Sequence, residues 1–366
     1  MRIGLSYWGF LGNGIVDSPD AGRFYRPMYV KALLDKGHEV YVMQQNRDDN
    51  FIFDNRLNFC EDFHGKSLPK LDILYLEWRW PIEGRNINCK NPNNYTPDLD
   101  RQIELMEYYH DKTDTKIIIH DEDRKLSFEE ELKWSKAIIA DWSLILKYQT
   151  RKRIRMMFPY DYNRLNEELP RINYNKDHLY CYLGNNYERD RQFKTYIGDV
   201  SRFYNGKVHV WGNWTKYPEQ YFKLRRQYPY VMFHDRIDWN DAIKIRKQFC
   251  CEVYLSKDEY SQYGCLSPRY IENIHLKVPI LMPKEFYGSK LFVNDNMLLS
   301  EDKYYIVAKV YELSHLYDFE RAQLIYDQTQ KFIELKKYFD INVFCNMFER
   351  IYNNEKIVDN DIEIGA

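Results

Sequence analysis

An arginine and a glutamate three residues apart stand at the start of a predicted helix, late in the chain. The segment reads Ser267-Pro268-Arg269-Tyr270-Ile271-Glu272 and leads into an apolar strand at 278–282. Side chains at this spacing share one helical face. A carboxylate there can accept hydrogen bonds from both hydroxyls of a ribose, and an arginine near a helix N-terminus can hold a diphosphate. The alternative interpretation is a surface ion pair without a ligand.

Glycine turns follow two predicted strands upstream of that helix. Gly184 ends the strand at 178–183, and Gly212 ends the strand at 207–211. A glycine at such a turn lets backbone N–H groups approach a phosphate closely. Arg189 and Arg191 follow the first turn and could add charge-assisted bonds to a diphosphate. The pattern is neither GxGxxG nor a P-loop, which disfavours dinucleotides and ATP.

Ile237 lies in a third turn of this kind, after the predicted strand at 230–234. Its backbone could read the edge of a uracil, and its side chain could cover the base. The alternative for Ile237 is simple core packing.

Three acidic residues, Asp121-Glu122-Asp123, follow the predicted strand at 115–119. Like charges held close together raise the pKa of one carboxyl toward the range of a general base. In a reaction that transfers a group to a hydroxyl, the general base takes the proton of that acceptor hydroxyl. We predict that Asp123, or else Asp121, is this base. The triplet is also a DxD, a common metal-binding pattern, as is Asp98-Leu99-Asp100. Because DxD is weak in an acidic chain, we predict that binding requires no divalent metal.

Two further segments are expected to border the same site and to bind the acceptor. Asp20 and Arg23 belong to the first loop region, and Trp78 and Arg79 follow the predicted strand at 71–76. A tryptophan there could form an aromatic wall for a base or a sugar ring. Packing in the core is the alternative for Trp78.

Alternating strands and helices must position these residues. The first half predicts strands at 2–6, 39–43, 71–76 and 115–119, with helices at 26–36, at 99–110 and from Ser127 onward. A second series predicts strands at 178–183, 207–211, 230–234, 252–255 and 278–282, with helices at 191–204, 218–227, 239–248 and 269–275. Such repeats indicate parallel sheets with helices on both faces, which bind ligands at the carboxyl ends of their strands.

The predicted fold class is therefore α/β, with two Rossmann-like domains facing a central cleft. The predicted domains are an acceptor domain at 1–165, a nucleotide-sugar domain at 175–320, and a helical segment at 321–366 that returns to the first domain. A chain of 366 residues is long enough for two domains of ordinary size.

Composition limits the cellular compartment and the partners that the sequence predicts. No apolar run reaches membrane-spanning length, and the N-terminus is typical of a β-strand, not of a signal peptide. Seven cysteines without a CxxC pair suit a reducing compartment, so we expect a cytoplasmic protein without a membrane partner. The formal net charge of −2 argues against a grip on DNA made mainly through phosphates. A local basic stripe at 151–155 is the exception to this near-neutral charge. Nothing in the sequence indicates an oligomeric state.

Taken together, these motifs resemble the phage DNA β-glucosyltransferases, which are enzymes of the GT-B type. The resemblance is clearest at 181–285, where the matching donor-site residues are Arg191, Gly212, Ile237, Arg269 and Glu272. A second donor arginine of the family falls on Tyr187, so Arg189 is the candidate replacement. The family's catalytic aspartate falls on Asp123.

The resemblance implies a UDP-sugar donor, such as UDP-glucose, and 5-hydroxymethylcytosine in double-stranded phage DNA as the acceptor. One alternative is a cell-surface glycan or protein glycosyltransferase with the same donor site. Another is a nucleotide-sugar or nucleic-acid binding protein without catalysis, which would be indifferent to loss of the Asp123 carboxylate.

Overall fold

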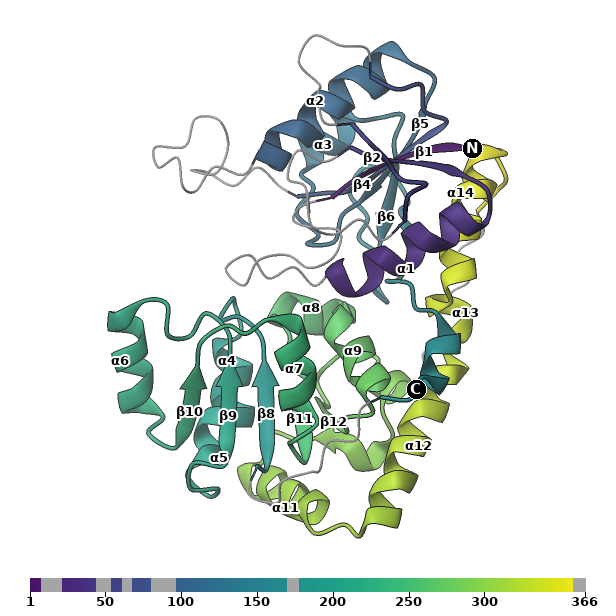
Figure 1. Ribbon diagram of the computed structural model, residues 1–366. Helices are drawn as coiled ribbons and strands as arrows, with labels where there is room; N and C mark the ends of the chain where they lie inside the picture. Colours follow the sequence, from purple (N-terminus) through teal and green to yellow (C-terminus); the bar gives the residue numbers. More distant parts are fainter. Residues whose placement is uncertain (8–21, 44–53, 61–67, 80–96, 170–177, 358–366) are drawn as a thin grey trace. The chain divides into compact units, whose positions relative to one another are not determined.

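The computed structural model describes residues 1–7, 22–43, 54–60, 68–79, 97–169 and 178–357 (Figure 1). These residues form two compact units. Among the described residues, the first unit contains those up to Asp161 together with those from Lys337 onward, and the second contains Tyr162–Lys336.

The first unit is built on a parallel sheet with strand order β3-β2-β1-β4-β5-β6-β7. Its strands are β1 (Arg2–Ser6), β2 (Glu39–Val42), β3 (Asn58–Phe59), β4 (Ile73–Glu77), β5 (Lys116–His120), β6 (Ile138–Asp141) and β7 (Ile154–Arg155). Its helices are α1 (Gly22–Asp35), α2 (Pro97–Lys112), α3 (Phe128–Lys133), α13 (Lys336–Phe339, whose first residue belongs to the second unit) and α14 (Ile341–Tyr352). Strand β1 pairs with both β2 and β4, so the direction of the strand order reverses between β1 and β4.

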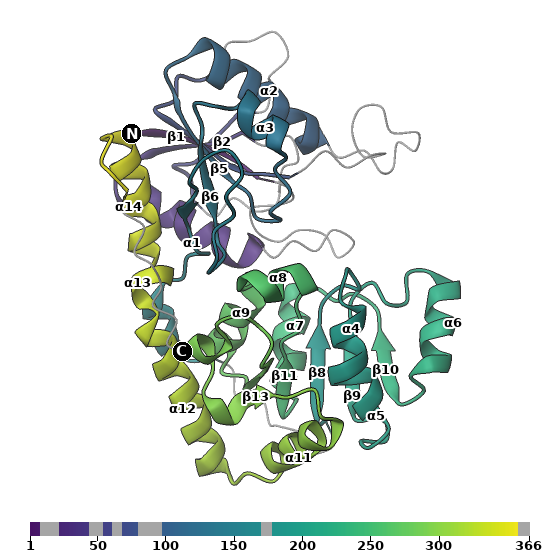
Figure 2. The same ribbon diagram turned by 180° about the vertical axis from the view of Figure 1, so that it is seen from behind.

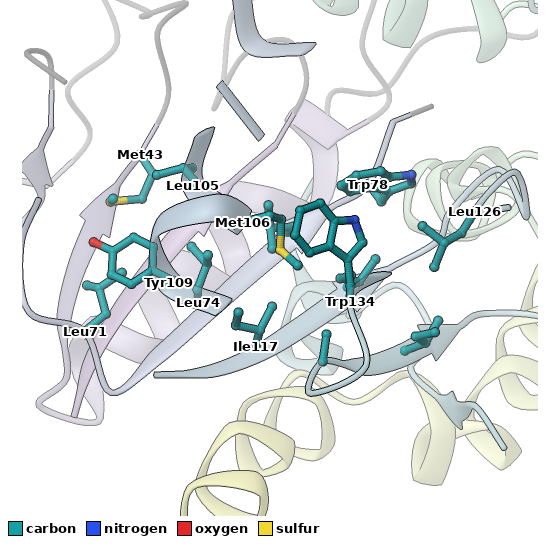
Figure 3. Close-up of a cluster of buried hydrophobic side chains, with 14 residues drawn as sticks. Met43, Leu71, Leu74, Trp78, Leu105, Met106, Tyr109, Ile117, Leu126 and Trp134 are labelled. Atoms are coloured by element: carbon teal, nitrogen blue, oxygen red, sulfur yellow. The ribbon is translucent and has the colours of Figure 1, made fainter. Parts of the chain in front are cut away.

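A buried apolar cluster fixes α2 on this sheet and includes Leu126 and Trp134, which flank α3 (Figure 3). Leu105, Met106 and Tyr109 of α2 pack with Leu74 of β4 and Ile117 of β5, and Trp78 and Trp134 close the cluster. Helix α3 follows Ser127, where the sequence predicts a helix to start, and it begins with a capping box. Its Ser127 hydroxyl accepts from the backbone N–H of Glu130, and the Glu130 carboxylate accepts from that of Ser127.

The last helix, α14, packs beside α1 (Figure 1). Phe344 of α14 lies against Tyr29 of α1 and Tyr75 of β4, with ring centroids 5.1 and 5.8 Å apart. Lys36 adds an ion pair to Glu349 at 3.0 Å. The amphipathic pattern of the tail predicts a helix, and its aromatic residues explain why α14 packs on the first unit.

The second unit repeats the design with strand order β10-β9-β8-β11-β12-β13, again parallel throughout. Its strands are β8 (Tyr180–Leu183), β9 (Val208–Trp211), β10 (Val231–His234), β11 (Cys251–Val253), β12 (Ile280–Pro283) and β13 (Leu298–Leu299). Its helices are α4 (Asp190–Phe193), α5 (Asp199–Ser201), α6 (Pro218–Gln227), α7 (Trp239–Arg246), α8 (Asp258–Tyr263), α9 (Pro268–Leu276), α10 (Ser289–Phe292), α11 (Lys303–Ser314) and α12 (Asp318–Glu334). Helix α7 covers one face of this sheet in Figure 1, and α4 covers the other face in Figure 2.

The prediction of two parallel α/β sheets is confirmed, and the local differences have physical causes. The helix expected at 191–204 is interrupted by a π-helical turn at Lys194–Gly198. A Cβ on Gly198 would lie 2.2 Å from the Tyr228 ring, so this turn brings the backbone directly against an aromatic side chain. Strand β6 was not predicted, because it is short and begins soon after α3 without a glycine or proline to mark the turn.

A row of histidines lies on β9 and β10 of the second sheet. The rings of His209 and His234 are stacked, and Nδ1 of His209 lies 2.9 Å from Nε2 of His234. Burial, followed by repulsion from His234 and His178, lowers the pKa of His209 to about 4. Burial also lowers the pKa of His120 and of His275 to about 4.

These shifts predict a loss of stability in mild acid. Between about pH 6.5 and pH 4, the unfolded chain binds protons at these histidines that the folded chain does not bind. The contribution of these three histidines to the free energy of unfolding should therefore be at its full value above pH 6.5 and should decrease as the pH falls, and it should outweigh the opposite effect of one carboxyl with a raised pKa, Glu122. Urea unfolding at about pH 7.5 and about pH 5 measures this. His209→Phe should reduce the difference, and equal stability of the wild type at both pH values would contradict the prediction.

Candidate functional site

The second sheet brings together several of the predicted donor-site residues where its strand order reverses. Strand β8 lies between β9 and β11, and Gly184 follows its carboxyl end. Gly212 follows the neighbouring β9, and its φ of +151° is a conformation that favours glycine. The two glycines are in direct contact, because a Cβ on Gly212 would lie 2.3 Å from the Gly184 carbonyl oxygen. The indole N–H of Trp214 donates to that same oxygen at 2.8 Å.

Arg269 lies against the first of these turns. Helix α9 begins after Ser267 with Pro268 at its first position, which places Arg269 in the first turn, as predicted. Its guanidinium lies over the Tyr182 ring, 4.9 Å from the centroid, and donates to the Leu255 carbonyl at 3.3 Å. Arg269 and the Gly184 turn therefore lie side by side at the carboxyl end of β8. Together they form a cationic corner.

Gly184→Ala is predicted to weaken UDP binding much more than it weakens folding. A Cβ there would lie 2.5 Å from both the Arg269 guanidinium and the Tyr182 hydroxyl. The flexible arginine can move aside at little cost in stability, but it then leaves the corner. The buried Tyr182 ring must also shift, which adds a stability cost. We expect UDP affinity to fall by about tenfold or more, as measured by calorimetric titration. Gly206→Ala is the control, because its φ of +81° strains a loop where a Cβ meets nothing within 4 Å. Equal losses of affinity in both variants would contradict the prediction.

Glu272 lies one helical turn from Arg269, as predicted, and it is not a surface residue. The glutamate is 5% exposed, and its Oε2 accepts from Nη1 of Arg246 at 2.8 Å. A surface ion pair between Arg269 and Glu272 is thus not what the structure has. Arg246 of α7 instead holds the carboxylate through one of its two oxygens.

The remaining residues predicted to bind the donor make contacts outside this corner. Arg189 donates to the carbonyls of Asn185 and Tyr187 within its own loop. Ile237 packs at the edge of a cluster that includes Leu183 and Trp211, the last residues of β8 and β9. Arg191 pairs with Asp258 at 3.1 Å, Glu285 at 3.4 Å and Glu301 at 3.0 Å. A diphosphate would therefore have to compete with three carboxylates for Arg191.

In the first unit, the loop after β5 places the two candidate bases in different environments. Both oxygens of Asp121 are used within the fold: it accepts from the backbone N–H groups of Lys125 and Leu126 and pairs with Arg153 at 2.9 Å. Asp123 is paired with Arg79, the predicted acceptor-binding arginine that follows β4. This arrangement indicates a structural role for Asp121 and leaves Asp123 as our candidate base.

Glu122 is a candidate that the sequence reasoning missed. Its carboxylate is buried and accepts from the Tyr25 hydroxyl at 2.9 Å, while the Trp142 indole N–H donates to its backbone carbonyl at 2.5 Å. Burial raises the pKa of Glu122 to about 7, against the opposing effects of Arg79 and Arg26. A carboxyl with this pKa could also serve as a general base. All three acids of this loop are buried, and the sequence gave no signal of which partner each would meet.

The other residues predicted to bind the acceptor also lie in different environments. Trp78 is fully buried in the apolar core, so we assign it a packing role. Arg23 is a half-buried residue in the first turn of α1. Asp20 lies outside the described residues. Nearby, Arg26 of α1 forms a buried ion pair with Glu77 at the end of β4, and the Tyr29 hydroxyl donates to Glu77 at 3.1 Å.

Neither a metal cluster nor a membrane-spanning helix is found in the part of the chain that the structure describes. No three His, Cys, Asp or Glu side chains there are grouped so that they could hold a metal ion. None of the helices described is both long and apolar enough to cross a bilayer.

Three buried residues beside the corner of Gly184, Gly212, Arg269 and Glu272 were also missed by the sequence reasoning. They are Tyr182, Arg246 and Glu252, which come from β8, α7 and β11. The one available signal was Glu252, a charged residue inside the apolar run at 250–255. A charge within a buried strand requires a partner, but the sequence did not indicate which arginine that partner would be.

The sequence matches no protein-family model and no curated protein. Solved structures do share the architecture. A mutant of T4 phage β-glucosyltransferase in complex with UDP-glucose matches with a TM-score of 0.64 at 13% identity, covering 96% of this chain and 100% of that chain. An α-glucosyltransferase in complex with UDP and a 13-mer DNA with a central A:G mismatch matches with a TM-score of 0.61 at 12% identity, covering 96% and 100%.

AviGT4, a glycosyltransferase involved in avilamycin A biosynthesis, matches with a TM-score of 0.55 at 9% identity, covering 96% of this chain and 97% of that chain. At these identities the likeness concerns the fold. The coverage of nearly the whole chain, which includes both parallel sheets, agrees with it. The chain therefore has the two-domain α/β fold of the GT-B glycosyltransferases.

Proposed function

We propose that this protein is a glycosyltransferase that moves a sugar from a UDP-sugar to a hydroxyl acceptor. The observation that carries the proposal is the corner formed by Gly184, Gly212, Arg269 and Glu272 at the strand-order reversal of the second sheet. Backbone groups and Arg269 would bind the diphosphate, and Glu272 would accept from the ribose hydroxyls. Solved structures of the same fold that contain UDP-glucose or UDP support this choice of donor.

For the acceptor, we propose 5-hydroxymethylcytosine in double-stranded DNA. Two observations support it: the motifs that resemble phage DNA β-glucosyltransferases, and solved structures of similar fold that are a DNA-modifying β-glucosyltransferase and an enzyme bound to DNA. The target base would have to leave the duplex stack to reach a catalytic group.

In the proposed mechanism, Asp123 takes the proton of the acceptor hydroxyl, the acceptor oxygen forms a bond to the anomeric carbon of the sugar, and the bond between that carbon and the diphosphate oxygen breaks to release UDP. Arg269 would neutralise the charge that develops on the departing UDP. Arg79, which pairs with Asp123, would hold that carboxylate in a fixed orientation.

The test is release of UDP from a panel of UDP-sugars, with and without duplex DNA that contains 5-hydroxymethylcytosine. Each reaction is run with Mn²⁺ and with a chelator, because a T4 phage β-glucosyltransferase structure contains UDP and Mn²⁺. Release that depends on the modified DNA supports the proposal and names the sugar. We predict that binding needs no divalent metal, so UDP should bind equally well with Mn²⁺ and with the chelator.

Two other outcomes would change the proposal. UDP-sugar binding or slow hydrolysis that ignores DNA would keep the donor site and move the acceptor to a glycan or a protein. That alternative has its own support in the near-neutral net charge and in a neighbour from avilamycin A biosynthesis. Failure to bind UDP or any UDP-sugar would overturn the proposed function.

A further inference from the structure

We infer that Arg246 and Glu252 are positioning residues that hold the ribose-binding and phosphate-binding side chains of the donor site in place. The inference deepens the proposed function, on which it rests. Neither residue belongs to the motifs that led to that proposal. They come from α7 and β11, whereas Arg269 and Glu272 belong to α9.

The four charges form one continuous group, in which Arg246, Glu252 and Glu272 are buried and Arg269 is partly exposed. Nε of Arg246 lies 3.1 Å from Oε2 of Glu252, and its Nη1 lies 2.8 Å from Oε2 of Glu272. The other oxygen of Glu252, Oε1, lies 4.0 Å from Nε of Arg269. Glu252 is thus placed between the two arginines, and Arg246 is placed between the two carboxylates.

The same carboxylate reaches the turn that we assign to the diphosphate. Oε1 of Glu252 accepts from the backbone N–H of Leu183 at 3.3 Å, and Leu183 immediately precedes Gly184. The end of β8, the first turn of α9 and the end of α7 are therefore tied to one side chain of the intervening strand β11.

Packing alone does not explain these charges. The side chain of Glu252 is completely buried and that of Arg246 is 4% exposed, which is an unusual environment for ionised groups. Burial raises the pKa of Glu252, opposed by Arg246 and Arg269. An apolar pair of similar volume would generally fill such a space with equal or greater stability. Charges at this place are better explained by what they orient than by what they stabilise.

The expected consequence concerns the ribose. Because Arg246 holds Oε2 of Glu272, the carboxylate has a fixed orientation in which Oε1 is the oxygen offered to the ribose hydroxyls. Discrimination between UDP and 2′-deoxy-UDP reports this contact directly. A charge-assisted hydrogen bond of this kind corresponds to a preference of roughly tenfold to a hundredfold for UDP.

The test is calorimetric titration of the full chain and its variants with UDP and with 2′-deoxy-UDP. In Arg246→Met we expect the preference for UDP to fall to about threefold or less. Arg246→Lys, which keeps the charge but not the planar fork, should restore part of it. In Glu252→Gln we expect UDP affinity itself to fall by about tenfold, through Arg269 and the Leu183 turn.

Arg321→Met is the matched control. Arg321 of α12 also contacts the β11 region, donating to the carbonyls of Cys250 at 2.8 Å and Phe249 at 3.2 Å, but these contacts lie at the other end of the strand from the donor corner. A loss of general packing around β11 would affect stability in this variant. We expect its preference for UDP to remain that of the wild type.

The outcomes separate the inference from the function on which it rests. A wild type that does not bind UDP overturns the proposed function, and one that binds UDP and 2′-deoxy-UDP equally overturns the ribose role of Glu272. A wild type that discriminates, together with Arg246 variants that discriminate equally well, overturns the inference. Where Arg246→Met does not fold, Arg246→Lys and Glu252→Gln decide the question by the same measurement.

Discussion

Asp123→Asn is expected to reduce transfer to the acceptor by roughly 10²–10⁴-fold, the usual contribution of a general base. The asparagine keeps the shape of the side chain and can still contact Arg79, but it cannot take a proton. Affinity for UDP should stay within about twofold of the wild type, since the donor contacts lie in the second unit. UDP release with acceptor measures the first quantity, and calorimetric titration measures the second.

Glu122→Gln and Asp121→Asn are the informative comparisons for this prediction. Glu122 is a neighbouring carboxyl with a pKa of about 7, so it is a real competitor for the role of base. If Glu122→Gln removes turnover while Asp123→Asn leaves it within about tenfold of the wild type, the base is Glu122 and our assignment is wrong. Asp121→Asn should affect folding before it affects the chemical step, because both of its oxygens serve the loop.

Arg153→Met is expected to lower the free energy of unfolding by about 3–5 kcal/mol, the usual cost of removing one partner from a buried ion pair. Arg153 is completely buried and pairs with Asp121 at 2.9 Å and with Glu131 at 2.6 Å. Its loss would leave these carboxylates without their main counter-charge in a region that excludes water. Urea denaturation at neutral pH measures the change.

Lys152→Met is the matched control, because Lys152 is the exposed neighbour of Arg153 in the same basic segment. We expect its effect on stability to stay within about 0.5 kcal/mol. If Arg153→Met also costs less than about 1 kcal/mol, the buried network is not the anchor of this loop.

The same network explains how Asp123 is placed. Arg124, the next residue, has a φ of +56°, and its guanidinium donates to Asp141 at 2.8 Å and to the Ile145 carbonyl at 3.0 Å. With Asp121 anchored on one side and Arg124 on the other, the intervening Glu122 and Asp123 have little freedom. Variants that weaken this clamp should therefore also lower activity in the protein that remains folded.

The sequence by itself determined the architecture, because hydrophobic periodicity and turn residues act locally. Strands such as β5 and β9 and helices such as α6 and α9 lie where their patterns predict them. Two series of alternating strands and helices leave few possible topologies, since crossovers between parallel strands are short and of one hand. The strand ends that carry Gly184, Gly212 and Asp123 could be found for the same reason.

Only the tertiary structure decided which charged residue meets which. Arg191 is held by three carboxylates from distant segments, Trp78 is buried in the core, and Glu272 is paired with Arg246 instead of with its helical neighbour. Long-range pairing also distinguishes Asp121, Glu122 and Asp123, which look equivalent in the sequence and are all buried: their partners are Arg153, Tyr25 and Arg79. A residue's type and spacing fix its local conformation, but its charge state and partners depend on the surfaces that the whole fold brings against it.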